Sequence, residues 1–203
     1  MMLSTILTAA TAYISTSIDY LVILMLIFSS TGKKQRWPVF VGDLLGTGVL
    51  VTTSLFIAYV LRLVPQTWIL GLLGVIPIIM GIKLLVFGEN DEEEAIQKGL
   101  TKNASIILNV AIITITTCGA DNIGIYVPLF AQNAISDIVV ILITFLFMLS
   151  LFCYIGFLLT RIPVLAEFLE KYSRYLMGVI YSGLGVYILW ESGTLTHFFP
   201  SYF

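Results

Sequence analysis

The sequence predicts an all-α integral membrane protein built from six transmembrane helices. Of its 203 residues, 59% are hydrophobic and only 11% are charged, whereas a soluble domain carries about 25% charged residues. Crossing a bilayer takes about 20 mostly apolar residues. Six segments meet this requirement, near residues 4–29, 38–61, 67–87, 104–130, 136–160 and 175–192. Their connections are short, so we expect a single transmembrane domain over residues 1–203.

The first apolar segment lacks a positively charged stretch before it and runs for the length of a span. We therefore expect a retained helix rather than a cleaved signal peptide. The net charge of −2 and the absence of a large basic patch argue against nucleic acid as a partner. The two cysteines, Cys118 and Cys153, both fall in predicted spans, which excludes an extracellular disulfide framework.

The basic residues predict the orientation, because Lys and Arg are in excess in the short cytoplasmic loops of membrane proteins. With six spans, nine of the ten basic residues fall on one side and only Arg62 falls on the other. The nine are Lys33, Lys34, Arg36, Lys83, Lys98, Lys102, Arg161, Lys171 and Arg174. We therefore expect both termini outside the cell.

An acidic run, GENDEEE at residues 88–94, then lies on the cytoplasmic side after the third span. Such charge runs usually form solvated connections, and we favour that interpretation. A cation-attracting entrance to a transport pathway is the functional alternative.

Two pairs of matching segments indicate an internal repeat. GVIPIIMGIKLL at residues 74–85 matches GVIYSGLGVYIL at 178–189 with an offset of 104 residues. TSIDYLVIL at 16–24 and CGADNIGIYV at 118–127 align their aspartates with an offset of 102 residues. Two matches at nearly one offset suggest a duplicated three-helix unit, and chance similarity between glycine-rich apolar helices is the alternative.

Because three is an odd number, the second copy would cross the membrane in the opposite sense, which makes the repeat inverted. We expect the first repeat at about residues 1–90, a cytoplasmic linker at about 88–103 and the second repeat at about 104–203. Inverted-topology repeats recur in secondary transporters, where the substrate binds near the midplane between the repeats.

Asp19 and Asp121 occupy matching deep positions in the two repeats. A carboxylate at the bilayer centre costs at least about 2.5–3.5 kcal/mol, so it needs a partner or a proton. No Lys or Arg lies at that depth in any predicted span. We therefore expect the two acids to converge and to bind a divalent cation between them.

Polar residues next to these acids supply further candidate ligands: Ser15, Thr16, Thr117, Cys118 and Asn122. Those that precede an aspartate by three or four residues share its helix face. Oxygen ligands suit Mg²⁺, Ca²⁺ or Mn²⁺, whereas a thiolate shifts the preference towards Zn²⁺ or Cd²⁺. For the three hydroxyl groups, hydrogen bonds from helix to helix explain their presence equally well.

A third acid, Asp43, lies five residues inside the second span, about 8 Å from its cytoplasmic start. It is a further candidate metal residue if it lines a cytoplasmic entrance, and it would be only an interfacial group if its side chain reached out of the membrane. Its neighbours Gly42, Gly46 and Gly48 predict a closely packed helix surface. Such a surface serves contacts inside one subunit or between the subunits of a homo-oligomer.

These segments resemble the cadmium-resistance transporter family (CadD), within the wider LysE superfamily of small exporters. The matching stretches cover nearly the whole chain in order: TSIDYLVIL (16–24), WILGLLGVIPIIMGIK (68–83), CGADNIGIYVP (118–128) and EKYSRYLMGVIYSGLG (170–185). CGADN together with the later SRYLM is the specific part of the match. One departure is Asp43, where the family pattern often carries an amide, and a third acid could favour harder metals or add a proton-coupling group.

The resemblance implies two inverted helix triplets, efflux of Cd²⁺ or a related divalent metal, and a bacterial cell membrane as the location. It also points to Asp19, Cys118, Asp121 and Asn122 as residues of the substrate site. No Walker A sequence is present, so we expect a secondary-active, proton-coupled exporter and not an ATP-driven pump or an enzyme. The divalent metal would be transported substrate, no cofactor is expected, and the lipid bilayer is the other partner.

We weigh four alternative functions against export of Cd²⁺. The same scaffold could export a harder cation such as Mn²⁺ or Mg²⁺, or an amino acid, although an amino acid would need a fixed positive charge for its carboxylate. An intramembrane aspartyl protease would need a Gly-x-Gly-Asp motif, which precedes neither Asp43 nor Asp121. A thiol carrier would need paired cysteines, and the first half of the chain has none.

Overall fold

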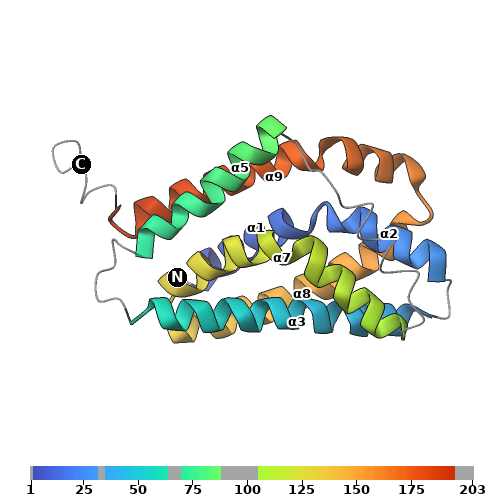
Figure 1. The fold of residues 1–203 in the computed structure, drawn as a ribbon, viewed down its shortest axis with the longest axis horizontal. Helices are drawn as coiled ribbons and strands as arrows, with labels where there is room; N and C mark the ends of the chain where they lie inside the picture. Colours follow the sequence, from blue (N-terminus) through green and yellow to red (C-terminus); the bar gives the residue numbers. More distant parts are fainter. Residues whose placement is uncertain (1, 32–34, 64–69, 88–104, 195–203) are drawn as a thin grey trace.

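A computed structural model describes residues 2–31, 35–63, 70–87 and 105–194 (Figure 1). Within these ranges all regular structure is helical, which confirms the predicted all-α class. The helices are α1 (Met2–Ser17), α2 (Tyr20–Thr31), α3 (Arg36–Leu61), the 3₁₀ turn η2 (Leu72–Gly74), α5 (Val75–Phe87), α7 (Ile106–Gln132), α8 (Ile135–Leu159) and α9 (Pro163–Glu191).

Some of the six predicted spans correspond to helices that are long and apolar enough to cross a membrane. Among the described residues, α3, α7 and α8 are long and apolar enough to span a bilayer. The pair α1 and α2 passes the same test together as one span bent by 59°. The apolar stretches Leu72–Val86 and Tyr175–Glu191 match the third and sixth predicted spans but are shorter. Three to four spans are therefore supported by length and composition, where the sequence predicted six.

The first predicted span, residues 4–29, is interrupted between Ser17 and Tyr20, which the sequence analysis did not anticipate. The Ser15 hydroxyl donates to the Ala12 carbonyl oxygen at 2.7 Å, and the Thr16 hydroxyl to that of Tyr13 at 3.2 Å. Side chains that bond to the preceding turn compete with the helix and often bend it. The break therefore falls where the polar run meets Asp19.

The last helix begins earlier than predicted, at Pro163 rather than at residue 175. Proline suits a helix start because its fixed φ is already helical and its missing N–H would have no partner there. The added part carries Glu167, Glu170, Lys171 and Arg174, and for that reason it did not count as a membrane span in the sequence analysis.

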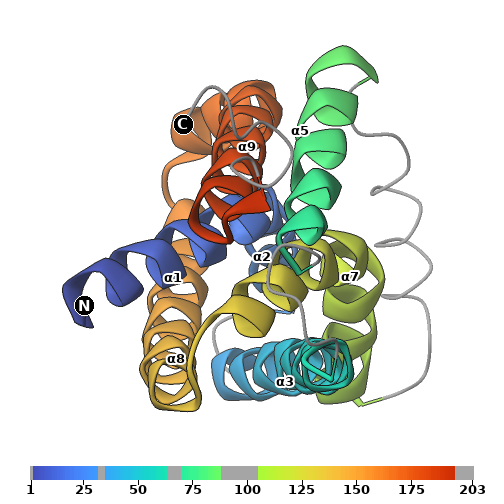
Figure 2. The same ribbon diagram turned by 90° about the vertical axis from the view of Figure 1, so that its left-hand side faces the viewer.

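The helices form three layers (Figures 1 and 2). α5 and α9 make one outer layer, α1, α2 and α7 lie in the middle, and α3 and α8 make the other outer layer. α3 packs mainly along α7, α8 along α1 and α2, and α5 along α9. Tyr13 and Tyr126 of the middle layer stack on Phe145 of α8, with ring centroids 5.5 and 4.5 Å apart.

Glycines set the closest helix contacts. A Cβ on Gly42 or Gly46 of α3 would lie 2.6 Å from an atom of α7, which confirms the predicted close surface at these two positions. Gly48 has nothing within 4 Å inside the subunit, so at this position the prediction of a close contact within one subunit is wrong, and a contact between subunits stays a prediction. Between α5 and α9, Gly74 lies against the Gly185 carbonyl, and Gly81 lies against that of Gly178.

Three of the described basic residues lie at the ends of helices. Arg36 and Arg161 lie over the same Phe157 ring, at 3.8 and 5.4 Å from its centroid. Arg62 lies at the other end of α3 and donates to the carbonyl oxygens of Phe130 and Asn133. These positions agree with the predicted partition. Lys33, Lys34, Lys98, Lys102 and the acidic run 88–94 lie outside the described residues.

The glycine contacts yield a paired prediction. A Gly185→Ala Cβ would lie 2.5 Å from Ile78 Cγ1, so we expect overpacking to destabilise the protein by about 1–3 kcal/mol. Gly183→Ala on the same helix is the control, because nothing lies within 4 Å there and alanine favours helix by up to about 1 kcal/mol. Thermal unfolding in detergent should separate the two variants, and equal midpoints would contradict this account of the α5–α9 contact.

Candidate metal-binding site

Asp121, on α7, is the acid of the predicted pair whose hydrogen-bond partner is clear. Its side chain is half-buried, and the Tyr181 hydroxyl of α9 donates to its Oδ2 at 3.0 Å. Tyr181 is only 1% exposed, and a buried tyrosine hydroxyl usually needs a hydrogen-bond partner. The contact therefore joins the middle layer to the α5–α9 layer through a carboxylate.

The second acid, Asp19, lies at the break between α1 and α2 and is 8% exposed. Its carbonyl oxygen accepts a hydrogen bond from the Val22 N–H at 2.9 Å, which closes the turn between the two helices. Asp19 and Asp121 both act electrostatically on the Tyr181 hydroxyl. Tyr181 is thus within electrostatic reach of both acids that the sequence indicated as site residues.

Lys83 of α5 is the basic residue whose charge acts on Asp121, and its effect is the smallest of those on that carboxylate. α5 approaches α7 closely, since a Cβ on Gly124 would lie 2.5 Å from Met80 Sδ, and Lys83 is one turn beyond Met80. This long-range effect is not an ion pair, so the expectation that no basic residue pairs with the acids at their depth stays a prediction.

The three candidate neighbours on α7 are in different environments. Asn122 is 2% exposed, and among the described residues its Oδ1 has no hydrogen-bond partner. Cys118 is 4% exposed, with Thr117 Oγ1 at 3.6 Å from its sulfur. The Thr117 hydroxyl also donates to the Ile113 carbonyl oxygen at 2.8 Å. Figure 1 shows that α7 changes direction in its middle, as expected where side chains bond to the preceding turn.

The hydroxyl groups beside Asp19 are engaged within the protein. Ser15 bonds within α1, and Thr16 lies 3.0 Å from the hydroxyl of the fully buried Tyr126. Since Thr16 has one proton and gives it to the Tyr13 carbonyl, Tyr126 is the donor in that contact. Of these contacts, that of Thr16 with Tyr126 joins two helices, as the helix-to-helix alternative expects, whereas Ser15 and Thr117 bond within their own helices. The ligand function of all three hydroxyl residues stays a prediction.

Asp43 belongs to a separate polar centre between α3 and α7. It is 2% exposed, so its side chain does not reach the interface as one interpretation had it. The Thr114 hydroxyl donates to Asp43 Oδ1 at 3.3 Å, and the Tyr20 hydroxyl lies 2.6 Å from Thr114. Tyr20 and Thr47 also hydrogen-bond to Asp43. Thr114 precedes Asp121 by seven residues, which is about 10 Å along a helix.

The candidate residues therefore do not form one cluster. Among the described parts of the chain, no three His, Cys, Asp or Glu side chains lie together as a metal-binding group. An ion near Asp19 and Asp121 would need hydroxyl, amide or backbone oxygens as further ligands. The sequence analysis missed Tyr181, Tyr20, Thr47 and Thr114, and the signal for the tyrosines was that a phenol inside an apolar span must find a partner.

The fold and this site together define a class of protein. Several apolar helices with acids buried between them are typical of a multi-pass membrane protein that moves a charged solute. The comparison with known families gives the particular one: the cadmium resistance transporter model matches residues 13–200, nearly the whole chain. The chain belongs to the cadmium-resistance transporter family, as the sequence resemblance indicated. Membership places it among metal efflux transporters rather than among enzymes. No curated protein and no solved structure matches the chain.

The Tyr181 contact makes a prediction about binding. Tyr181→Phe removes the donor that orients Asp121 and stabilises its charged form, a hydrogen bond of about 1.5–3 kcal/mol. We expect Cd²⁺ binding to purified protein to weaken by about tenfold or more. Tyr154→Phe is the matched control because Tyr154 is 60% exposed on α8. Equal affinities for the two variants would argue against a link between Tyr181 and the ion.

Proposed function

We propose that this protein is a secondary-active exporter of divalent heavy-metal cations, with Cd²⁺ as the leading substrate, bound between Asp19 and Asp121. The observation that carries the proposal is that Tyr181 bonds to Asp121 and lies within electrostatic reach of Asp19. Two carboxylates near the bilayer centre are costly, and a doubly charged ion balances both charges at once. Tyr181 occupies Oδ2 of Asp121, which leaves Oδ1 for the ion.

The donors around the acids are mixed in character. Asn122 offers an amide oxygen, the break at Asp19 offers backbone carbonyls, and Cys118 offers a thiol one turn before Asp121. A thiolate ligand would favour Cd²⁺ or Zn²⁺ over Mn²⁺ and Mg²⁺. In this proposal the thiol gives the preference for soft metals, and the two carboxylates give most of the affinity.

An inverted repeat is part of the proposal, and the glycine contacts support it. The offset of 104 residues carries Gly74 to Gly178. It likewise carries Gly81 to Gly185. When the two halves are exchanged, the contact of Gly74 with Gly185 therefore becomes the contact of Gly178 with Gly81. The remaining helix pairs behave alike, because exchanging the halves turns the α3–α7 pair into the pair of α8 with α1 and α2.

Such a repeat implies six crossings with both termini outside, in the cell membrane of a bacterium. α3 and α7 run parallel, as two spans that both start in the cytoplasm must do: Gly42 meets Ile107 and Val110, and Gly46 meets Ala111 and Thr114. The shared Phe157 contact of Arg36 and Arg161 would then mark the cytoplasmic end.

Proton coupling completes the mechanism that we infer. Release of the ion leaves two carboxylates in a poorly solvated site, and protons taken up from outside would neutralise them for the return step. Asp43 on α3 is a third acid, with hydroxyl partners in place of a metal-ligand set. Its partner Thr114 lies about 10 Å from Asp121 along α7. Asp43 is the residue best suited to hold a proton separately from the ion.

One observation favours a second candidate function. The charge of Lys83 acts weakly on Asp121, and amino acid export would need a fixed cation near the acids to bind the substrate carboxylate. The family match to cadmium resistance transporters weighs against that alternative. A transport assay with metals and amino acids side by side separates the two substrates.

The central test is metal uptake into inverted membrane vesicles. Asp19→Asn and Asp121→Asn each remove one charge from the pair, and leaving a buried charge uncompensated costs about 3–5 kcal/mol. We expect the rate of Cd²⁺ uptake to fall by about a hundredfold. Asp137→Asn, in the first turn of α8, is the control. Normal transport by either test variant would end the two-carboxylate proposal.

The thiol makes a separate prediction about selectivity. Cells that express Cys118→Ser should lose resistance to Cd²⁺ and Zn²⁺ while their tolerance of Mn²⁺ and Mg²⁺ changes little, because a hydroxyl is a harder ligand than a thiolate. Cys153→Ser is the control, since Cys153 is buried on α8, a helix that carries none of the candidate metal residues. An equal loss for all four metals would assign Cys118 to the core.

A further inference from the structure

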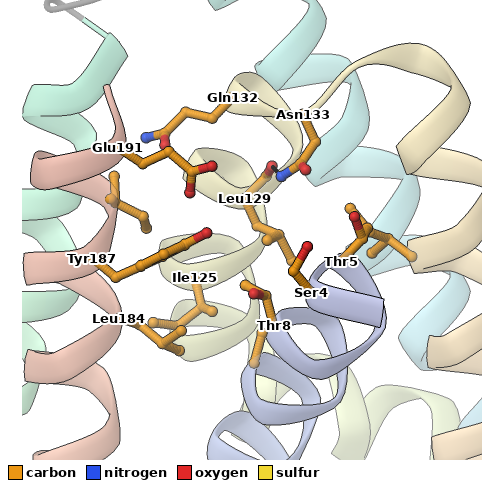
Figure 3. A pocket seen from close by; sticks show the side chains of 13 residues that line it. Ser4, Thr5, Thr8, Ile125, Leu129, Gln132, Asn133, Leu184, Tyr187 and Glu191 are labelled. Carbon is orange, nitrogen blue, oxygen red and sulfur yellow. Dashed lines mark hydrogen bonds between the residues drawn. The ribbon is translucent and has the colours of Figure 1, made fainter. Parts of the chain in front are cut away.

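A cavity opens beside the N-terminal end of α1 and the C-terminal ends of α7 and α9 (Figure 3). Its volume is about 70 Å³, and one water needs about 10–15 Å³ on this measure, so several waters or a partly hydrated ion fit inside. None of the site residues discussed above lines it. Among the described lining residues, Glu191 carries the only charge.

The polar lining gathers around Tyr187 of α9. Figure 3 shows the Tyr187 hydroxyl between the Glu191 carboxylate and the side chain of Thr8 on α1. The Gln132 amide at the end of α7 lies on the same side, and its Nε2 is buried with no partner among the described residues. A tyrosine of α9 thus lies beside a carboxylate here, as Tyr181 does at Asp121.

Three helices lead from this cavity to the acids in the membrane. On α7, residues 121, 125, 129 and 132 recur at helical spacing, so Asp121 shares a face with the lining residues Ile125, Leu129 and Gln132. On α9, Tyr181 shares a face with Leu184, Ile188 and Glu191 in the same way.

On α1, the face of Thr5, Thr8 and Ala12 continues to Ser15 and Thr16, directly before the break at Asp19. The cavity and the acids therefore occupy two levels of one interface between α1, α7 and α9. Glu191 is ten residues above Tyr181 on α9, which is about 15 Å.

We propose that this cavity is a second, outward-facing binding site for the exported divalent cation, in which Glu191 is the charged ligand and an apolar layer separates the ion from Asp121. The inference rests on the proposed function, since it assumes that the ion leaves the site at Asp19 and Asp121. Its chemistry is that of a hydrated cation held by oxygen ligands.

The carboxylate of Glu191 is the feature of the lining that favours a cation. Glu191 is the last residue of α9, where the partial negative charge of the helix end adds to that of the carboxylate. α7 also ends at the cavity, with Gln132 as its last residue, but Arg62 donates to the carbonyl oxygens of Phe130 and Asn133 there, and α8 begins at the same end. Glu191 and the end of α9 therefore supply the negative charge of the cavity.

The floor of the cavity is apolar. Ile125 is 1% exposed, Leu129 is 5% exposed, and Leu184 packs against the same core cluster. An ion that sheds its water cannot pass such a layer without movement of a helix, so the layer closes the path in this structure. The polar groups above it would receive the ion when the layer opens and would rehydrate it.

Cd²⁺ titration of the purified full-length protein by calorimetry tests the proposal. The wild type should bind two ions of unequal affinity, with Glu191→Gln losing the weaker site and Asp121→Asn the tighter one. Asp137→Asn is the matched control, because Asp137 begins α8 at the same end and does not line the cavity.

The outcomes separate the two sites. Retention of both sites in Glu191→Gln overturns the second site. A single wild-type site that only Asp121→Asn removes also overturns it, and leaves the proposed function standing. A single site that only Glu191→Gln removes supports the cavity and contradicts binding at the aspartate pair.

Side-chain accessibility gives an independent readout of the direction that the cavity faces. Thr8→Cys in intact cells should react with a charged maleimide added outside, because Thr8 lines the cavity. Leu7→Cys should not react, because Leu7 does not line the cavity and is 60% exposed on the outer face of α1, where we expect lipid rather than water. The parent chain is the blank, since Cys118 and Cys153 are buried. Labelling of Thr8→Cys only from the cytoplasmic side would overturn the outward assignment.

Discussion

The constraint on which the rest of the structure depends is the cost of a carboxylate in a medium without water. Asp43 and Asp121 lie inside apolar helices and accept hydrogen bonds from hydroxyl groups of other helices, while Asp19 is buried at the break between α1 and α2. Tyrosine supplies several of these partners, because its ring packs as an apolar group while its hydroxyl can donate. The interfaces between the three layers are consequently held by polar contacts set in apolar surroundings.

Much of the fold could be predicted because it follows from composition and length. The apolar segments 38–61, 104–130 and 136–160 correspond closely to α3, α7 and α8, since a long apolar run leaves the chain few alternatives to a helix. The break before Asp19 and the early start of α9 could not be predicted in the same way. The break depends on side chains that bond to the backbone. The early start depends on a charged stretch of helix outside the apolar run.

The candidate site was predicted less completely. Sequence position identified the three acids, because a charge in an apolar helix is conspicuous, but it could not identify their partners. Tyr181 and Thr114 look like ordinary residues of their helices until the neighbouring helices are in place. The electrostatic effect of Lys83 on Asp121 likewise depends on the approach of α5 to α7 at Met80 and Gly124, two residues far apart in the sequence.

α7 carries partners of both polar centres, since Thr114 bonds to Asp43 and Asp121 bonds to Tyr181. Any rotation or sliding of this helix that widens the space around one acid must also change the geometry at the other. A single moving element can therefore link the occupancy of two sites that never touch. The bend in the middle of α7 gives that element a point at which the two ends can move by different amounts.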